Sequence, residues 1–294
     1  MVAFVVSAIS FSLMFVSGDP AIAIAGEGST EADIQVIRKN FGFDQPFHVQ
    51  YWKWISRVAK GDLGESFYFQ KPVVDLIAER MPVTGLLGLL SICFALTLSI
   101  PLGIIAAVKQ NTVFDRFTLG LATIGQATPS FWLGLMLIVV SSVKLRILPV
   151  SGSSSLYHFI LPTIVLGYYA TPSMMRLTRA GMIEALQSDY IRTAHSKGLL
   201  PLSILLKHAF RNAILPVVSV AAVEFGFILG GSVVVESVFS LHGIGFLAWE
   251  SISRNDFPTI QAIILVYAMI YVGLTFLADL LNAKLDPRLR ATTS

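Results

Sequence analysis

One acidic side chain, Glu224, lies in the middle of an otherwise uncharged apolar segment, Ala213 to Val235. An ionised carboxylate inside a long apolar helix is costly, so such a residue is by default a candidate functional site. The chemistry available to it is binding, because a carboxylate attracts the cationic end of a small solute. A protonated or hydrogen-bonded glutamate between two helices stays open as the alternative. A second acid, Asp279, lies near the end of the last apolar segment and is interpreted as a helix-end contact.

The sequence contains no motif that combines residues for covalent catalysis or metal binding. The dispersed histidines are His48, His158, His195, His208 and His242. None has the H-E-x-x-H spacing that places two metal ligands on one helix face. The chain also lacks the G-x-x-x-x-G-K-[ST] loop that holds the phosphates of ATP. We therefore expect no catalytic residue, no metal site and no cofactor bound by this chain.

The stretch from Arg176 to Asn212 is too long for a simple turn and has a clear helical pattern. Apolar residues at steps of three and four predict one helical stripe, formed by Ile183, Leu186, Tyr190 and Ala194. Gly198 is expected to end this helix. A second amphipathic run contains Leu202, Leu205, Leu206 and Ala209. Such helices either dock on a protein partner or lie on a lipid surface, and the pattern leaves both open.

The elements that carry these residues are those of a membrane protein. Of 294 residues, 54% are hydrophobic and 13% are charged, whereas an ordinary soluble domain has roughly 25% charged residues. The mean hydropathy is +0.72, and one water-soluble core cannot hold this excess. The net charge of +3 does not indicate a nucleic-acid-binding surface. The composition predicts an all-α polytopic membrane protein without a nucleic-acid partner.

Six segments are predominantly apolar and approach the roughly 20 residues needed to cross a bilayer. They run from Val2 to Ser17, Val83 to Val108, Phe117 to Val143, Phe159 to Met175, Ala213 to Val235 and Ile260 to Leu281. The first cation of the chain is Arg38, so a cleaved signal peptide, which needs a positive start, is not expected. Because the first segment is short, we expect the chain to start inside the true first helix. A bundle of six transmembrane helices is the simplest architecture.

Cations in the short loops give the predicted orientation. On one side lie Lys109, Arg116, Arg176, Arg179, Arg192, Lys197, Lys207, Arg211, Lys284, Arg288 and Arg290. The opposite short loops contain Lys144, Arg146 and Arg254. Because cytoplasmic loops have the excess of lysine and arginine, the start of the first span and the C-terminus are predicted to face the cytoplasm. The segment from Gly18 to Pro82 is then outside.

This outer segment is predicted to fold as a small cap. Ser29 or Thr30 can cap a helix that begins at Glu31 and ends at Gly42. A second helix opens after Pro46, and its apolar face is predicted from the spacing of Val49, Trp52 and Ile55. A third short helix is expected near Pro72. Shielding the bundle and contacting a partner or solute both stay open as roles of the cap.

Several short motifs occur in the order found in one family. The run Asp189 to Leu199, DYIRTAHSKGL, followed by RNAILP from Arg211 to Pro216, resembles the EAA loop of ATP-binding-cassette (ABC) importer permeases, in the form of the dipeptide, oligopeptide and nickel branch. Further matching runs are Gly18-Asp19-Pro20, Phe43-Asp44-Gln45-Pro46, Gly61-Asp62-Leu63-Gly64, Pro129-Ser130-Phe131-Trp132-Leu133-Gly134, Gly230-Gly231 before Val233-Val234-Val235-Glu236, and Leu285-Asp286-Pro287-Arg288. The ordered set extends over nearly the whole chain.

The resemblance implies a type I ABC importer transmembrane domain that pairs with a homologous second permease subunit. It also implies two cytoplasmic ATP-binding subunits, which hold ATP and magnesium, and a periplasmic solute-binding protein. The ATPase-coupling residues that it implies are Glu184, Asp189, Tyr190, Arg192, Thr193, Ala194, Lys197 and Gly198. In this interpretation the apolar stripe docks on an ATPase, Arg192 and Lys197 pair with carboxylates, and Gly198 permits a sharp exit. Glu224 would then line the translocation path.

Some features depart from the pattern of the family. The cationic N-terminal stub is missing, and the separation of Gly198 from Leu215-Pro216 is longer than in the general EAA pattern. The fifth span has Glu224 where relatives often have glutamine. After that span, Leu241-His242-Gly243-Ile244-Gly245 replaces the more usual Trp-Pro-Gly-Leu-Gly.

The sequence is interpreted as a multi-pass permease subunit of the bacterial inner membrane, surrounded by membrane lipid, that imports di- or oligopeptides. Nickel or glutathione import by the same architecture is the alternative within the family, and an independent secondary transporter is the alternative from another class. The predicted divisions are a first transmembrane helix over residues 1–17, a periplasmic cap over 18–82, a transmembrane core over 83–281 with a coupling loop over 176–212, and a cytoplasmic tail over 282–294.

Overall fold

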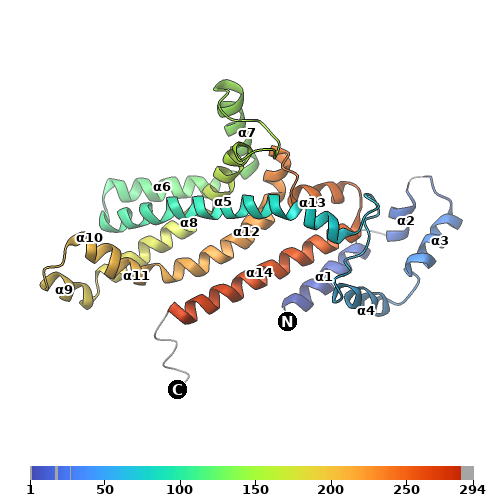
Figure 1. Cartoon of the computed structure of the whole chain (residues 1–294), viewed down its shortest axis with the longest axis horizontal. Coiled ribbons are helices and arrows are strands. Elements are labelled where there is room, and N and C mark those ends of the chain that lie inside the picture. The colour runs from blue at the N-terminus through green and yellow to red at the C-terminus, as the bar shows by residue number, and fades with distance from the viewer. Residues whose placement is uncertain (1, 17–18, 27, 286–294) are drawn as a thin grey trace, which may run out of the picture. The chain divides into compact units, whose positions relative to one another are not determined.

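The computed structural model describes residues 2–16, 19–26 and 28–285, and this part of the chain is mainly helical. Its elements, labelled as in Figure 1, are α1 (Val2–Val16), α2 (Pro20–Ala25), α3 (Glu31–Phe41), α4 (Phe47–Val58), α5 (Val73–Val108), α6 (Val113–Ala127), α7 (Ser130–Leu137), η1 (Ile138–Lys144), α8 (Tyr157–Leu186), α9 (Asp189–Ser196), α10 (Pro201–Ser203), η2 (Ile204–Ala209), α11 (Phe210–Ala213), α12 (Leu215–Phe239), α13 (Ile244–Ser253) and α14 (Phe257–Leu285). No strand occurs in the described residues, so the predicted all-α fold is confirmed. The Asp286-Pro287-Arg288 motif and most of the predicted tail lie outside them.

The chain divides into two compact units. Unit 1 comprises Met1–Thr84 and His242–Val272, and unit 2 comprises Gly85–Leu241 and Gly273–Ser294. Helices α1 to α4 and α13 therefore belong to unit 1, whereas α6 to α12 belong to unit 2. Along the chain, α5 and α14 each contribute residues to both units.

Long apolar helices confirm a multi-pass membrane fold. By length and composition, the described helices able to cross a membrane are Val73–Val108, Leu215–Phe239 and Phe257–Leu281. They contain the predicted second and sixth spans, and they contain the fifth except for its first two residues, since α12 begins at Leu215. The helix pair Val113–Ala127 and Ser130–Lys144 gives a fourth span if it is counted as one segment, and Ala3–Phe15 is a shorter apolar helix. The predicted number of six spans is therefore not matched by this measure.

The fourth predicted span, Phe159 to Met175, lies in α8, which packs against α6, α7, α11 and α12 in unit 2. Residues along most of α8 are buried, including Val165, Met174 and Met182. Its internal prolines are tolerated because neighbouring helices surround the backbone. A helix covered by protein does not need the uniformly apolar surface of a lipid-facing span. This explains why α8 is long enough to cross a membrane but is less apolar than the three helices named above.

The third predicted span, Phe117 to Val143, is not one continuous helix. Its two halves, α6 and the segment formed by α7 and η1, differ in direction by 101°. At the break, Thr128 has extended backbone, with φ −83° and ψ 122°. The ring of Pro129 disfavours α-helical backbone in the residue before it, and Pro129 has no N–H to continue the helix. The expectation of one continuous helix is corrected by this proline break, and the two halves count as one span only if the bent pair is taken together.

The first helix of the outer segment forms as predicted. Thr30 caps α3, and its hydroxyl accepts a hydrogen bond from the backbone N–H of Asp33 at 3.3 Å. Asp33 in turn accepts a hydrogen bond from the backbone N–H of Thr30 at 3.1 Å, which completes a capping box. Gly42 ends α3 in the left-handed conformation, with φ 72°.

Two other predictions for the outer segment are corrected. The helix expected near Pro72 is not separate, because it continues without a break as α5. In α4 the buried residues are Tyr51 and Trp54, whereas Trp52 is exposed. The reason is that Tyr51 and Trp54 pack on Phe11 of α1 in one cluster, which turns the neighbouring face of α4 outward.

Two glycines let α8 approach α5 closely in unit 2. A Cβ atom on Gly103 would lie 2.8 Å from the carbonyl oxygen of Met175. A Cβ atom on Gly167 would lie 2.7 Å from the carbonyl oxygen of Ser91. Because these neighbours are backbone atoms, no side chain fits at either position. The spacing of α5 and α8 is thus set by backbone contact.

Candidate coupling surface and solute cavity

The helix predicted to couple to an ATPase forms as α9, but it is separate from α8. α8 ends at Leu186, and Ser188 at the cap position of α9 has extended backbone with ψ 154°. Serine favours such a position because its short polar side chain competes with helical hydrogen bonding. The predicted stripe is therefore divided, since Ile183 and Leu186 do not share a helix with Tyr190 and Ala194.

The apolar face of α9 packs inward. Ile191 and Ala194 are buried in a cluster with Met182 of α8 and Ala209 of η2, and only 2% of Ile191 is exposed. Tyr190 lies at the surface, where its hydroxyl accepts a hydrogen bond from Nδ2 of Asn212 at 3.0 Å. The inward face of α9 therefore packs against other helices of the same chain. The prediction that this stripe provides the docking area is therefore wrong for Ala194.

Exposed apolar surface lies after Gly198. Leu200 exposes 74% of its surface and Leu202 65%, and both are flanked by the exposed Leu199 and Leu206. We call these four residues the leucine ridge. Gly198 has φ +70°, and a Cβ atom there would meet no atom within 4 Å. Glycine is therefore favoured at this turn for its backbone conformation and not for space.

Charged and polar side chains accompany the leucine ridge. The remaining predicted coupling residues are exposed, and they are Glu184, Asp189, Arg192, Thr193 and Lys197. Nη1 of Arg192 lies 3.8 Å from Oδ1 of Asp189 in the same helix. Such an exposed ion pair contributes little to stability, so both groups can pair with a partner instead. The stretch thus combines an apolar ridge with polar groups on the adjacent helix, as protein interfaces do.

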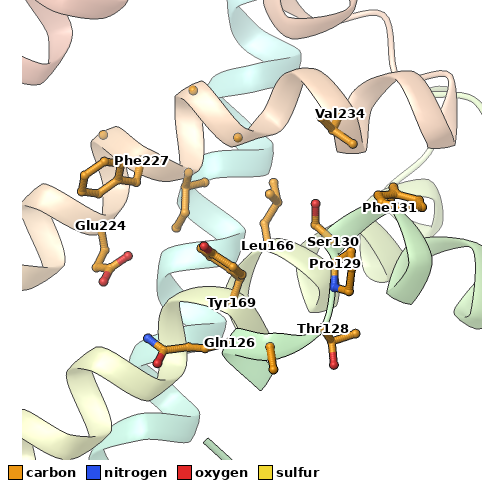
Figure 2. A pocket seen from close by; sticks show the side chains of 15 residues that line it. Gln126, Thr128, Pro129, Ser130, Phe131, Leu166, Tyr169, Glu224, Phe227 and Val234 are labelled. Atoms are coloured by element: carbon orange, nitrogen blue, oxygen red, sulfur yellow. The ribbon is translucent and has the colours of Figure 1, made fainter. Parts of the chain in front are cut away.

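A cavity of about 810 Å³ lies in unit 2, beside the proline break. Its lining residues come from α6, α7, α8, α12 and the break, and they are Gln126, Ala127, Thr128, Pro129, Ser130, Phe131, Leu166, Tyr169, Glu224, Gly226, Phe227, Ile228, Gly230, Gly231 and Val234. Figure 2 shows Gln126, Tyr169 and Glu224 around the same opening. Two of these lining residues have ionisable side chains, and they are Glu224 and Tyr169, whose phenol is a weak acid. Glu224 therefore contributes the carboxyl group of the cavity wall.

Glu224 is oriented by the neighbouring helix α8. The hydroxyl of Ser173 donates a hydrogen bond to Oε1 of Glu224. A carboxylate has two oxygens and about four acceptor positions, so Glu224 keeps acceptor capacity for a second donor. Gly230 and Gly231 of α12 also border the cavity, and a Cβ atom on either would meet no atom within 4 Å.

Polar contacts fix the cavity wall of α6 to α8. Nη1 of Arg176 donates a hydrogen bond to Oε1 of Gln126 at 3.1 Å. The hydroxyl of Tyr168 donates to the carbonyl oxygen of Leu121 at 3.0 Å. Because both donors are on α8, the helix that precedes α9, the wall of the cavity is linked to the predicted coupling helix through one element.

A third contact joins the beginning of α6 to α8. Asp115 is buried and accepts hydrogen bonds from Nε and Nη2 of Arg179, each at 2.7 Å. Asp115 also accepts from the backbone N–H of Asn111 at 2.9 Å, before the helix starts. The sequence identified Arg179 only as one of the cations of the loops predicted to face the cytoplasm. No local spacing predicts its pairing with Asp115, since 64 residues separate the two.

No group of three or more His, Cys, Asp or Glu side chains that could hold a metal ion occurs within residues 2–16, 19–26 and 28–285. The two features that stand out in unit 2 are the surface around α9 and the cavity at Glu224. Neither has the arrangement of nucleophile, base and orienting group that covalent catalysis requires. An exposed apolar ridge and a cavity with one carboxyl group suit noncovalent contact with a protein or a small molecule.

An apolar helical fold with a docking surface and a polar-centred cavity defines a transport component of a membrane, and comparison with known proteins identifies the family. Residues 99–291 match the family described as binding-protein-dependent transport system inner membrane component. Residues 1–88 match its N-terminal companion family. The chain therefore belongs to this family and is a multi-pass permease subunit of an ABC importer of the inner membrane. The family consists of permease components that work with partner subunits and have no cofactor of their own.

Curated relatives extend over almost the whole chain. The glutathione transport system permease protein GsiC of Escherichia coli O6:H1 is 41% identical over 288 residues, which cover 98% of this chain and 94% of the relative. GsiC of Escherichia coli strain K12 and of Shigella dysenteriae serotype 1 are each 40% identical over the same lengths. These proteins belong to the branch that the ordered motifs indicated.

Solved structures show the same fold at low sequence identity. An inward-facing form of the MetNI methionine ABC transporter has a TM-score of 0.58 at 15% identity, covering 72% of this chain and 96% of that one. An amino acid ABC transporter crystallised with histidines has a TM-score of 0.53 at 17% identity, covering 79% and 98%. The predicted type I importer fold is confirmed.

Proposed function

We propose that this chain forms half of the translocation pathway of an ABC importer for peptide-like solutes, with glutathione and di- or oligopeptides as the candidates. The observation that carries the proposal is the cavity with a single carboxyl side chain, Glu224, in its lining. Peptides with a free N-terminus present an ammonium group, which a carboxylate binds well. The 40–41% identity to proteins named as glutathione permeases supports the same class of solute.

The complete importer in this proposal contains four kinds of subunit. A homologous second permease forms the other half of the pathway, and a periplasmic solute-binding protein delivers the solute. Two cytoplasmic ATP-binding subunits hold ATP and magnesium and hydrolyse the nucleotide. This chain supplies no catalytic group, so its task is to change between inward-open and outward-open packings.

The excess of lysine and arginine in one set of loops supports a cytoplasmic C-terminus and a periplasmic segment over residues 18–82. In the same proposal, residues 1–17 form the first transmembrane helix, residues 83–281 form the core with the coupling loop at 176–212, and residues 282–294 form a cytoplasmic tail. The long extension of α5 through Val73 then lies at the outer surface of the membrane.

The coupling surface is proposed to be the leucine ridge together with the exposed residues of α9. Apolar area supplies most of the affinity of such a contact, and Arg192 and Lys197 supply charge complementarity. Buried Ile191 and Ala194 transmit the movement, because they join α9 to the core of unit 2. Arg176 and Tyr168 then carry it to the cavity wall at α6.

Transport of defined solutes tests this function. The chain is reconstituted with its second permease and ATPases in vesicles, and uptake of labelled glutathione, a dipeptide and Ni²⁺ is measured with the solute-binding protein outside. We expect ATP-dependent uptake of glutathione or the peptide and none of Ni²⁺. Uptake of Ni²⁺ alone would overturn the peptide assignment. Uptake without ATPases would favour an independent secondary transporter.

Docking of the leucine ridge is tested separately by Leu200→Asp. We expect the ATPases to be lost from the purified complex, because an ionised side chain cannot enter an apolar contact without a large desolvation cost. Leu156→Asp is the matched control, since Leu156 is also in unit 2 and is 68% exposed. Equal retention of ATPase by both variants would contradict the proposed docking surface, whatever solute is transported.

A further inference from the structure

A second cavity, of about 1040 Å³, lies in unit 1 and has no role in the proposed pathway. We call it the cap groove and define it by six of its lining residues, which are Phe11, Lys39, Lys53, Trp54, Arg57 and Gln261. Phe11 and Trp54 belong to the buried aromatic cluster of α1 and α4, so one wall is apolar. The three cations are exposed along the groove.

The floor of the cap groove contains a hydrogen-bond donor without an acceptor. Gln261 of α14 is only 5% exposed, yet its Nε2 has no hydrogen-bond partner in the described part of the chain. A buried amide left unpaired is costly, so it marks a place where an acceptor belongs. The backbone around Gln261 is fixed, since its carbonyl oxygen accepts a hydrogen bond from Ser10 of α1 at 3.3 Å.

The charges around the cap groove favour an anionic ligand. Among the described residues, neither Lys39, Lys53 nor Arg57 forms an ion pair. Nζ of Lys53 donates instead to the neutral side-chain oxygen of Gln45 at 2.7 Å. The acids in the lining are Asp62, whose Oδ1 accepts from the backbone N–H of Gly64 at 2.8 Å, and Glu65. The cations therefore exceed the carboxylates, and they lie near an unpaired donor.

The depth of the cap groove is that of a membrane surface. Gln261 lies in the first turns of α14, the apolar helix Phe257–Leu281, about 6 Å from its start at 1.5 Å per residue. Phe11 and Met14 line the groove from the C-terminal half of α1, and they belong to one buried cluster with Leu265 of α14. Exposed Trp52 and Phe47 beside it are typical of the interfacial region. Cations and aromatic side chains at this level match phospholipid headgroups.

We propose that the cap groove binds an anionic phospholipid, with the phosphate and its ester oxygens near Lys39, Lys53, Arg57 and Nε2 of Gln261 and the acyl chains along α1 and α14. The bound lipid would fasten the cap helices to the spans of unit 1. A soluble anion satisfies the cations but leaves the apolar wall uncovered, and the groove borders the start of the apolar helix α14. Both observations favour a lipid.

Quenching of tryptophan fluorescence by brominated lipids tests this proposal on the full-length chain. Trp132 and Trp249 are replaced by Phe, which leaves Trp52 and Trp54 beside the groove. The chain is placed in phosphatidylcholine vesicles that contain a small fraction of either brominated phosphatidylglycerol or brominated phosphatidylcholine. We expect much stronger quenching by phosphatidylglycerol. Equal quenching by the two lipids would overturn the proposal, and this comparison needs no substitution in the groove lining.

The charge dependence is tested by a matched pair of variants. Lys39→Gln with Arg57→Gln is expected to weaken the preference for phosphatidylglycerol by roughly tenfold or more. Lys60→Gln with Lys71→Gln removes the same charge from exposed residues outside the groove lining and should keep the preference. Equal loss in both pairs would show only general attraction to a charged membrane. Loss of binding of the solute-binding protein, with unchanged lipid preference, would assign the groove to that protein and overturn the proposal.

Discussion

Asp115 and Arg179 form a two-pronged ion pair in unit 2, with Nε and Nη2 of the arginine each 2.7 Å from a carboxylate oxygen. The pair joins the first turn of α6 to α8, seven residues before the end of α8 at Leu186. In the proposed function, a movement of α9, which follows α8, would reach α6 through this contact. α6 ends at the cavity, so the pair would lie between the proposed docking surface and the proposed solute path.

Asp115→Asn is expected to destabilise the complex and to reduce the ATPase stimulation caused by solute. The substitution leaves a partly buried guanidinium without its carboxylate, and breaking such a pair costs about 3–5 kcal/mol. Thermal unfolding of the purified complex and ATPase assays with and without solute measure the two effects. Asp189→Asn removes the exposed pair with Arg192 and should change stability by less than about 1 kcal/mol. Equal changes in the stability of the two variants would contradict the claim that the buried pair stabilises the protein more than the exposed pair does.

Glu224→Gln is expected to remove discrimination between peptides with a free amino group and N-acetylated peptides. The carboxylate can pair with an ammonium group, and loss of a hydrogen bond between charged groups is worth about tenfold or more in affinity. Uptake rates of the two peptides by reconstituted importer measure the ratio. Asp279→Asn, which neutralises an exposed acid outside the cavity lining, should leave the ratio unchanged. If Glu224→Gln keeps the wild-type ratio, the carboxylate has only a structural role.

Gly198→Asn is expected to retain the ATPases, whereas Gly198→Val should lose them. Asparagine tolerates the left-handed backbone that φ +70° requires, but a β-branched residue does not. The space around the position is open, so size alone does not decide the result. Co-purification of the ATPases is the measurement. Gly120→Val in α6 is the control, because that glycine also has open space and lacks a positive φ; a loss there would point to general misfolding.

The start of α3 is expected to open in acid. Hydrogen bonds from the side chain and then the backbone of Thr30 hold the pKa of Asp33 below its usual value. A carboxylate with a lowered pKa stabilises the fold above its unfolded pKa, and that stability is lost as the pH falls below about 4. Amide exchange of α3 between neutral and acidic pH should show faster opening in acid. Asp33→Asn should remove this pH dependence, while Asp44→Asn should not.

Much of the fold follows from the local sequence pattern. A membrane helix forms its backbone hydrogen bonds within itself and must be apolar over about 20 residues. That rule predicted α5, α12 and α14, and capping residues predicted α3 and the end of α9. It could not predict the direction in which α9 faces. Tyr190, Ile191 and Ala194 are all compatible with an apolar stripe, and only packing against Met182 and Ala209 decides that Ile191 points inward.

The candidate site was predicted in part for the same reason. Glu224 is visible in the sequence because its charge contrasts with its surroundings. Its neighbours in the cavity are not visible, since Gln126 and Tyr169 come from distant segments. Pro129 was part of a family motif, yet its effect on the cavity depends on the 101° change of direction between α6 and the helix that follows.

The break at Thr128 and Pro129 determines what kind of surface a solute meets. Where a helix stops, its last carbonyl groups and the first N–H groups of the next helix have no partner within the helix. Residues 126–131 of this break border the cavity, so the end of α6 and the start of α7 form part of its lining. In the proposed function, a peptide passing this point would meet peptide groups like those of its own main chain. A contact of that kind does not depend on side chains, so it would discriminate poorly between peptide sequences.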